Sequence, residues 1–324
     1  NSAGAQVLDN VITETVSNGV SLNPSPNSLV SGNDISNLGE NGIYVLGSDN
    51  TDILNNTITN DGTGTAIRVA DSSNVEVGKD DLRTWVRTGF WPWQGYWDVT
   101  PRGNSISNVD SGVVVTGGTN NEVVNNGMTS VDYGVKLSGT TNATVRDNNM
   151  TGNSVTGIDV ADGSNGADIH DNTLDHFNTG INVSASSDVT IDDNTLTDVL
   201  DGIVADTANN LVVTDNDITG RTASGTGVKV SNSDNVKIGD YEVLGPVLGT
   251  TALDNDGNDI TNFATGIDAD NVNDLQIVLN DIDGNNTGTG VTVTNSSNVN
   301  VGGGAPGSFL WISGTHSLGN NIHD

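Results

Sequence analysis

The sequence predicts an all-β solenoid of about 12 coils, and three observations lead to this prediction. Twelve Asn residues, each two positions before an apolar residue, form a series along the chain, most often at intervals of 22 residues. Within each interval a Gly is followed by Val or Ile, and apolar residues alternate with polar ones, as in strands with one buried face. Three intervals are longer than one repeat by roughly 18 to 26 residues, which indicates insertions into a regular array.

A well-preserved repeat shows the elements of one coil. Residues 180–196 read GINVSASSDVTIDDNTL, with Gly-Ile-x-Val, a polar loop, Val-x-Ile and then Asp-Asn-x-Leu. Each apolar run is short and has period 2, so each coil is expected to form three strands joined by Gly, Asn, Asp and Ser turns. Stacking the coils about 4.8 Å apart gives three parallel sheets and a rod of roughly 55–60 Å.

The recurring Asn is interpreted as structural. At a tight corner its amide can satisfy backbone groups that no sheet ladder reaches, and stacked amides can bond one another. The other interpretation is that Asn only tolerates positive φ at a turn. The fixed offset to an inward apolar residue favours an inward ladder, formed by Asn33, Asn56, Asn104, Asn126, Asn148, Asn172, Asn194, Asn216, Asn258, Asn280 and Asn320.

Composition suits a single repeat body spanning residues 1–324. Hydrophobic residues make up 33% and aromatic residues 4%, which is low for a globular core but adequate for a thin stack of Val, Ile and Leu. Disorder is the competing interpretation of so polar a chain, and the regular placement of Val and Ile argues against it. Since the chain begins and ends within a repeat and has no capping segment, it is expected to be part of a larger protein, or else a mature chain whose ends meet partners.

The charge limits the classes of partner. A net charge of −31 repels nucleic acid and anionic membrane surfaces, so neither is expected as a partner. There is no Cys and no apolar run long enough for a membrane span. Neither a cofactor nor a metal site is predicted, although Asp-rich turns leave weak Ca²⁺ binding open.

Several stretches resemble a known family. They are SSNVEVG (72–78), SSDVTIDDNTL (186–196), NNLVVTDNDITG (209–220) and SDNVKIG (233–239). The chain resembles the right-handed parallel β-helix repeat proteins of pectate-lyase-like architecture, and the resemblance covers nearly all of it outside the insertions. It implies a three-sheet, right-handed solenoid. Because that family includes lyases, hydrolases, epimerases, phage tailspikes, adhesins and stalks, the resemblance alone does not choose a function.

The three insertions occupy residues 79–102, 240–256 and 303–318. Each follows the same local pattern, an Asn, two apolar residues separated by one position, and a Gly, and each closes at a Gly-Asn pair. All three are therefore expected to leave and re-enter at one corner of the coil and to project from one edge of the rod.

Aromatic residues gather in these insertions, including all five Trp. Trp and Tyr rings stack on sugars or on other rings, and Arg supplies forked donors. Three interpretations stay open: packing against the rod, a protein or assembly interface, and a glycan site. The candidate binding residues are Trp85, Arg87, Phe90, Trp91, Trp93, Tyr96, Trp97, Tyr241, Phe309 and Trp311.

No catalytic set stands out. Asp is so abundant that carboxylate pairs such as Asp192 and Asp193 are expected by chance and are interpreted as solvated turns. No His pair has the spacing of a metal motif; the His residues are His170, His176, His316 and His323.

The predicted function is structural: an extracellular or cell-surface rod, part of an adhesin, stalk or filament, whose aromatic loops contact subunits of its own kind, a neighbouring protein or a surface polysaccharide. The alternative is a carbohydrate-active β-helix protein, either a polysaccharide lyase or epimerase or a non-catalytic glycan-binding module. An enzyme is the less favoured interpretation, since no convergent catalytic residues are apparent.

Overall fold

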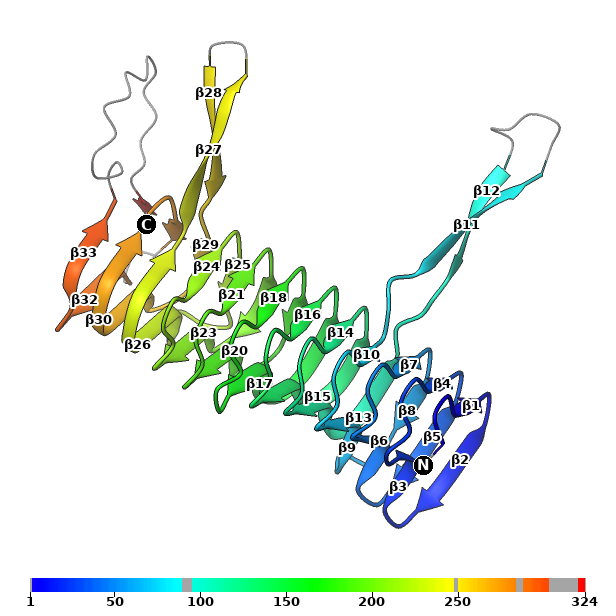
Figure 1. Cartoon of the computed structure of the whole chain (residues 1–324). Helices are drawn as coiled ribbons and strands as arrows, with labels where there is room; N and C mark the ends of the chain where they lie inside the picture. Colours follow the sequence, from blue (N-terminus) through cyan, green and yellow to red (C-terminus); the bar gives the residue numbers. More distant parts are fainter. Residues whose placement is uncertain (1, 89–94, 248–249, 284–287, 303–319, 324) are drawn as a thin grey trace.

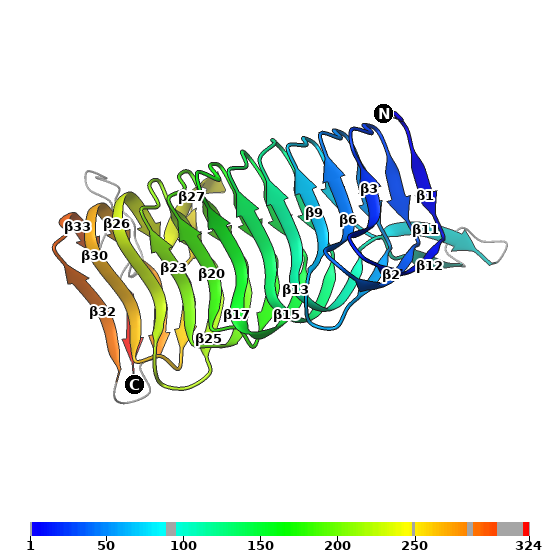
Figure 2. The ribbon, with the colours of Figure 1, turned by 90° about the horizontal axis from the view of Figure 1, so that it is seen from below.

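The protein is an all-β solenoid of about 12 turns, as predicted (Figures 1 and 2). The computed structural model describes residues 2–88, 95–247, 250–283, 288–302 and 320–323, and for residues 241–247, 250–256, 321 and 323 it describes the backbone only. Every element in these ranges is a strand. No helix in the described part is long and apolar enough to span a membrane.

Strands from successive coils stack in parallel into three columns. The first column contains β1 (Gln6–Leu8), β4 (Leu29–Ser31), β7 (Asp52–Leu54), β10 (Glu76–Val77), β14 (Glu122–Val124), β16 (Thr144–Arg146), β18 (Asp168–His170), β21 (Thr190–Asp192), β24 (Val212–Thr214), the ends of β26 (Thr226–Ile238) and β30 (Thr265–Ile277), and β33 (Ser297–Val301).

The second column follows the Asn corner. It contains β2 (Val11–Thr15), β5 (Asp34–Leu38), β8 (Thr57–Thr59), the starts of β13 (Ser105–Thr116), β15 (Gly127–Ser138) and β17 (Asn149–Ala161), then β19 (Thr173–Asp175), β22 (Thr195–Val199), β25 (Asp217–Gly220), β29 (Asp259–Thr261), β31 (Asp281–Asp283) and β34 (Asn321–His323).

The third column begins with the recurring Gly-Val/Ile element. It contains β3 (Asn18–Leu22), β6 (Asn41–Leu46), β9 (Thr65–Ala70), the ends of β13, β15 and β17, β20 (Thr179–Ser184), β23 (Asp201–Asp206), the starts of β26 and β30, and β32 (Thr289–Thr294).

The core is a narrow stack of aliphatic side chains. Register places like residues over one another, for example Ile43 over Ile67, and Ile67 in turn over Val113, and all three are fully buried. Burying one such side chain stabilises the fold by about 1.5–3 kcal/mol. Each coil shares this burial with its neighbours, so a few apolar residues per coil are enough.

The Asn side chains form a continuous buried ladder. The Nδ2 of Asn148 donates to the Val123 and Arg146 carbonyls at 2.8 and 2.9 Å and to the Asn172 Oδ1 at 3.0 Å. Its Oδ1 accepts from the backbone N and the Nδ2 of Asn126, each at 3.0 Å. Equivalent amide-to-amide bonds link each Asn of the series to the next, from Asn10 to Asn320.

Positive φ falls on the residue before the ladder Asn. Asp147, Asp171, Asp193 and Asp215 have φ between 51° and 56°, whereas the Asn that follows each of them is absent from the residues with positive φ. The left-handed turn thus points the acidic side chain outward and the following amide inward. The sequence left two roles open for the recurring Asn, an inward amide ladder and a turn with positive φ. The structure assigns the ladder to the Asn and the positive φ to the residue before it.

A second polar ladder lies at another corner. The backbone N of Ser25 donates to the Ser48 Oγ at 2.8 Å, and the backbone N of Ser48 donates to the Ser72 Oγ at 2.9 Å. Ser164 and Ser186 repeat this contact further along the rod. All these Ser residues are buried, so their hydroxyls satisfy backbone groups that the strand ladders leave unpaired.

The recurring Gly of the third column marks a close approach. A Cβ at Gly134 would collide with the Met150 Sδ and would lie 2.6 Å from the Gly157 carbonyl oxygen. Met150 is the apolar residue two positions after Asn148. The Gly-Val/Ile and Asn-x-apolar elements, which recur together in the sequence, therefore pack against each other across successive coils.

We predict that Asn148→Ala lowers the free energy of unfolding by about 2–3 kcal/mol, because several buried backbone groups lose their partner. Asn149→Ala is the matched control, since Asn149 is the next residue and is exposed. Chemical denaturation followed by circular dichroism gives both values. Equal losses in the two variants would contradict the ladder's structural role.

Gly134→Ala should lower the free energy of unfolding by about 1–3 kcal/mol through overpacking. Gly127→Ala is its control, because a Cβ at Gly127 meets nothing within 4 Å, and it should change that free energy by less than about 1 kcal/mol. The same denaturation measurement applies. If Gly134→Ala leaves the free energy of unfolding unchanged, the coils can accept a methyl group at Gly134 and the explanation by overpacking is wrong.

Candidate functional site

The first insertion forms a separate two-stranded ribbon. Strands β11 (Leu82–Arg87) and β12 (Gly95–Thr100) pair antiparallel and belong to a sheet of their own. Within the second insertion, β27 (Asp240–Val247) and β28 (Thr250–Asp256) pair in the same way. Both ribbons project from the same edge of the rod (Figure 1).

The ribbons leave the coil at the outward turn beside the Asn ladder. A Cβ at Gly78 would meet the Val124 carbonyl oxygen of the next coil, and one at Gly103 would meet the Asn125 carbonyl oxygen. The ladder bond from Asn56 to Asn104 still forms across a sequence separation of 48. The insertion thus opens beside the Asn corner without interrupting the stack.

Only part of the predicted binding set lies in the described region. Trp85, Arg87, Tyr96 and Trp97 lie on the β11–β12 ribbon. The other predicted residues fall outside the described residues or, for Tyr241, on a stretch described by its backbone alone: Phe90, Trp91, Trp93, Tyr241, Phe309 and Trp311.

One face of the β11–β12 ribbon combines aromatic and cationic side chains. The register pairs Arg83 with Val99, Trp85 with Trp97, and Arg87 with Gly95. Because side chains alternate across a strand, these six residues share one face. We call it the Arg–Trp face. The opposite face carries Leu82, Thr84 and Val86 from β11, paired with Thr100, Asp98 and Tyr96 from β12.

The two Trp rings contact each other edge to face. Their centroids are 5.2 Å apart and their planes make an angle of 65°. A Cβ at Gly95 would lie 2.8 Å from the Trp85 Cε2 and Cζ2, so the Trp85 ring lies over this glycine. Gly95 therefore provides the space that Trp85 occupies, and Trp85 in turn supports Trp97.

The ribbon's rings are largely solvent-accessible. Trp97 is 61% exposed, Tyr96 55% and Trp85 38%. These values do not fit rings packed over the flank of the rod. Exposing large aromatic side chains on both faces of an isolated ribbon is unfavourable in water, which makes this surface a candidate for binding.

Charged contacts fix the base of the ribbon to the rod. Arg146 on β16 forks onto Asp80, with Nη1 donating to Oδ1 at 2.7 Å and Nη2 to Oδ2 at 3.2 Å, and Nη1 also donates to Asp147 at 2.6 Å. The Asn125 Nδ2 donates to the Asp81 Oδ1 at 2.8 Å and to the Lys79 carbonyl at 3.1 Å. These contacts set the direction in which the ribbon leaves.

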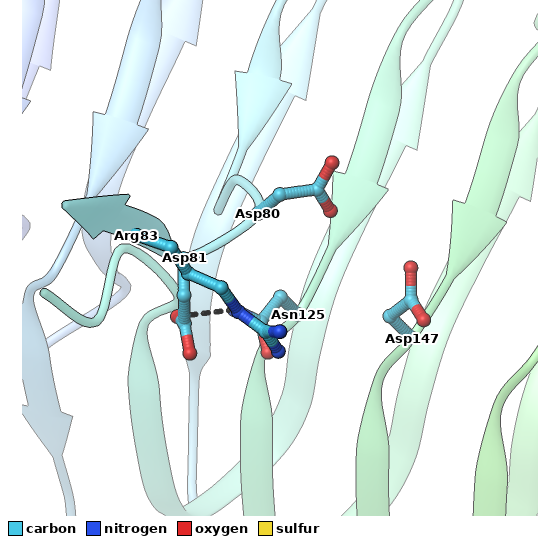
Figure 3. A pocket seen from close by; sticks show the side chains of 5 residues that line it. All are labelled: Asp80, Asp81, Arg83, Asn125 and Asp147. Atoms are coloured by element: carbon cyan, nitrogen blue, oxygen red, sulfur yellow. Dashed lines mark hydrogen bonds between the residues drawn. The ribbon is translucent and has the colours of Figure 1, made fainter. Parts of the chain in front are cut away.

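A polar pocket of about 300 Å³ lies between this base and the rod (Figure 3). Asp80, Asp81, Arg83, Asn125 and Asp147 line it. Hydrogen bonding to the Arg146 guanidinium lowers the pKa of Asp80 and raises that of Arg146, so both groups are charged at neutral pH. The carboxylates at the base of the ribbon are thus engaged in holding it.

Outward carboxylates line the edge between the two ribbons. Asp147, Asp171, Asp193 and Asp215 occupy equivalent turn positions in successive coils. Burial and then the neighbouring Asp192 and Asp171 raise the pKa of Asp193. Within the described residues no group of three or more His, Cys, Asp or Glu side chains could hold a metal ion.

Sequence reasoning missed the positioning residues of this site. Nothing in the sequence marks Arg146, because its partner Asp80 lies 66 positions away and meets it only through the direction of the ribbon. Gly95 had a weak signal, as the glycine between two aromatic clusters of one insertion.

Two family models match the chain. A model described as periplasmic copper-binding protein (NosD) matches residues 72–242 and 160–302, and a model described as right-handed β-helix region matches residues 1–91. No curated protein matches.

Solved structures share the fold at low sequence identity. The Azotobacter vinelandii mannuronan C-5 epimerase AlgE6 A-module aligns with 92% of this chain and 81% of its own, at 14% identity and a TM-score of 0.52. A tailspike protein of E. coli bacteriophage HK620 in complex with a hexasaccharide aligns with 89% of this chain at 13% identity and a TM-score of 0.56. This chain covers 54% of that tailspike's length.

Loss of the two hydrogen bonds from Arg146 to Asp80 should make the orientation of the β11–β12 ribbon on the rod less well defined. We predict that Arg146→Gln broadens the distance distribution between spin labels at Thr84→Cys and Thr190→Cys, measured by double electron–electron resonance. The chain has no native Cys, so labelling is specific. Arg68→Gln, which removes an exposed rod cation, should leave the distribution narrow.

The ion pair between Arg146 and Asp80 should depend on pH. Since the pKa of Asp80 is lowered in the folded protein, its contribution is present above the ordinary value of 3.8 and is lost as pH falls through the folded-state pKa. The wild-type distribution should broaden below pH 3.8 and resemble that of Arg146→Gln. An unchanged, narrow distribution in both cases would contradict the anchor.

The sequence repeat, the three parallel columns of strands and the family matches all indicate the same family. Over half of the chain matches the NosD model in one continuous segment, and the N-terminal coils match the β-helix model. The chain belongs to the right-handed β-helix (NosD) family.

Proposed function

We propose that this protein is a non-catalytic β-helix protein that binds carbohydrate through the Arg–Trp face of the β11–β12 ribbon and works outside the cytoplasm. The observation that carries the proposal is the exposed Trp85–Trp97 pair on a face that the rod does not cover. Indole rings present a flat apolar surface to sugar C–H groups, and flanking polar groups orient the ligand.

The comparisons support the class of ligand without identifying it. One neighbour with the same fold is a mannuronan epimerase and another was solved with a hexasaccharide. At 13–14% identity they share the fold with this chain, so the argument for a glycan rests on the ribbon itself. A location outside the cytoplasm follows from the same proposal and fits the family description, which is of a periplasmic protein.

The described donors do not fit the copper named in the family description. Copper prefers clustered imidazole, thiolate and thioether ligands. The His170 Nδ1 lies 2.8 Å from an Asp171 carboxylate oxygen, and His176 contacts Asp198 in the same way. Met128 and Met150 are fully buried within the aliphatic core. No step of the proposed function is therefore assigned to copper.

Catalysis is the less favoured role. A general acid or base must reach the ligand and carry a pKa suited to proton transfer. Asp80 and Asp81, at the base of the ribbon, are held by Arg146 and Asn125, and the pKa of Asp80 is lowered. Asp98 on β12 pairs with Thr84 on the face opposite the Trp pair. The contacts of Asp80 and Asp81 suit positioning of the ribbon.

A subunit contact is the second candidate, consistent with a stalk or filament. It is favoured by Leu82 and Tyr96, which expose apolar surface on the face opposite the Trp pair. A glycan lying on one face would leave that surface uncovered, whereas a protein partner could enclose the whole ribbon.

A polysaccharide array with wild-type protein and two single variants tests the proposal. Trp97→Ala should weaken glycan binding by about five- to thirtyfold, the equivalent of 1–2 kcal/mol of lost stacking. Tyr96→Ala is the matched control, because it removes an exposed ring from the opposite face of the same ribbon.

Either of two results would contradict the proposal. One is that the wild-type protein binds no glycan on the array. The other is that Tyr96→Ala and Trp97→Ala weaken association of the protein with itself in analytical ultracentrifugation, which would favour the subunit contact.

A further inference from the structure

We infer that the third column of strands is a docking surface for a second copy of this chain, which packs on it antiparallel with two-fold symmetry. The column lies on the side of the rod away from the ribbons, because the ribbons leave at the Asn corner, between the first and second columns (Figures 1 and 2). The inference is independent of the proposed function, since a copy docked there leaves the Arg–Trp face uncovered.

The outward positions of this column lie in a central row with one row on either side. We call them the third-column face. The flanking rows are formed by the residues three positions before and two positions after each residue of the central row. In chain order the central row consists of Ser21, Tyr44, Arg68, Val114, Lys136, Asp159, Asn182, Val204, Lys229, Asp268 and Thr292.

Charge is divided between the two halves of this face. From β3 to β15 it carries two cations, Arg68 and Lys136, and no carboxylate. Acidic residues that adjoin these strands in sequence lie at the corners along the edges of the face: Glu40, Asp71, Asp110 and Asp132. From β17 to β30 the face carries Lys229 and the carboxylates of Asp159, Asp201, Asp206, Asp268 and Asp270. The face therefore has a basic half and an acidic half.

The two cations of the basic half form no ion pair within the described residues. Basic side chains elsewhere on the rod, such as Arg146 and Arg221, pair with carboxylates. Arg68 is exposed and has no such partner in the described part of the chain. The Lys136 Nζ lies 3.2 Å from the centre of the Tyr133 ring. Because a solvent-accessible ring holds a cation only weakly, both cations can pair with charges of another molecule.

The division of charge is self-complementary. A two-fold axis that lies in the face between β15 and β17, perpendicular to the rod, sets the basic half of each copy against the acidic half of the other. Lys136 then faces the partner's Asp159, and Arg68 faces the strand that carries the partner's Asp201 and Asp206. Each pairing occurs twice. The carboxylates of this face occur on β17, β23 and β30, which meet β15, β9 and β3, so none is set against another.

The carboxylates of β23 are held in place before association. The Asp206 Oδ1 accepts from the Ser231 Oγ and the Asn232 Nδ2, each at 2.7 Å. These bonds, that from Ser231 first, lower the pKa of Asp206, so this side chain is charged at neutral pH. The Asp201 Oδ1 accepts from the Thr226 backbone N at 2.8 Å. Charges that are already positioned lose less entropy when a partner binds.

The face is large enough for a stable dimer. The strands from β3 to β30, about 4.8 Å apart and about 20 Å long, cover roughly 900 Å², and a specific interface buries about 800 Å² on each partner. Each copy has a net charge of −31. Charges are screened over about 8 Å at physiological ionic strength, so the charges in contact have more influence than the distant ones.

An anionic polymer is the other occupant that the basic half could attract. A polymer lying along the rod would also meet the carboxylates of the acidic half, which repel it. A second copy offers both signs of charge in the required order, so the division of charge favours it.

Sedimentation equilibrium with two charge-reversed variants tests the inference. Arg68→Asp with Lys136→Asp reverses the basic half, and Asp159→Lys with Asp206→Lys reverses carboxylates of the acidic half. Wild-type protein should form a dimer whose dissociation constant rises at least about hundredfold in each variant, because like charges then meet across the interface. An equimolar mixture of the two variants should recover the dimer, since each supplies the charges that the other lacks. This recovery also shows that both variants are folded.

Three results would overturn the inference. One is a wild-type protein that stays monomeric at every concentration accessible to the measurement. Another is a mixture of the two variants that stays monomeric. The third is a monomeric wild-type protein that binds an acidic polysaccharide through Arg68 and Lys136, which would assign the basic half to a polymer. Binding of a neutral glycan should be the same in wild-type protein and both variants, so the dimer and the proposed function can fail separately.

Discussion

Stacked amides at one corner of the coil support every other feature of this protein. Each Asn of the ladder satisfies backbone groups of its own and the preceding coil and bonds the next amide along the rod. Because the amide is inward, the residue before it turns outward, with positive φ at Asp147, Asp171, Asp193 and Asp215. That outward turn is where the ribbons leave, so a chain can be inserted there while the ladder bond between Asn56 and Asn104 is kept.

The regular stack gives the ribbon a rigid base. Arg146 on β16 and Asn125 in the turn after β14 hold the stem through Asp80 and Asp81. Further out, Gly95 leaves space for the Trp85 ring, which supports Trp97. The contacts run from buried amides to exposed rings, and they keep the Arg–Trp face ordered before any ligand arrives. Such preorganisation reduces the entropy lost on binding.

The fold could be predicted from the sequence because the same residue pattern recurs in successive coils. Val, Ile and Gly recur at matched positions, and one copy of the pattern explains the others. The site was only partly predictable. Trp85, Arg87, Tyr96 and Trp97 were identified from their composition, which is unlike that of the repeat. The arrangement of these residues could not be predicted. Strand pairing within an insertion, and the contact of Arg146 with Asp80, are not part of the repeating pattern.

The function predicted first, a structural or adhesive rod, is less well supported than the proposed carbohydrate binding, because the ribbon exposes an indole pair. The most direct measurement follows the indole N–H signals of the five Trp residues by nuclear magnetic resonance during titration with a glycan. The account predicts saturable shifts of the Trp85 and Trp97 signals. Saturable binding that leaves both signals unmoved would contradict it.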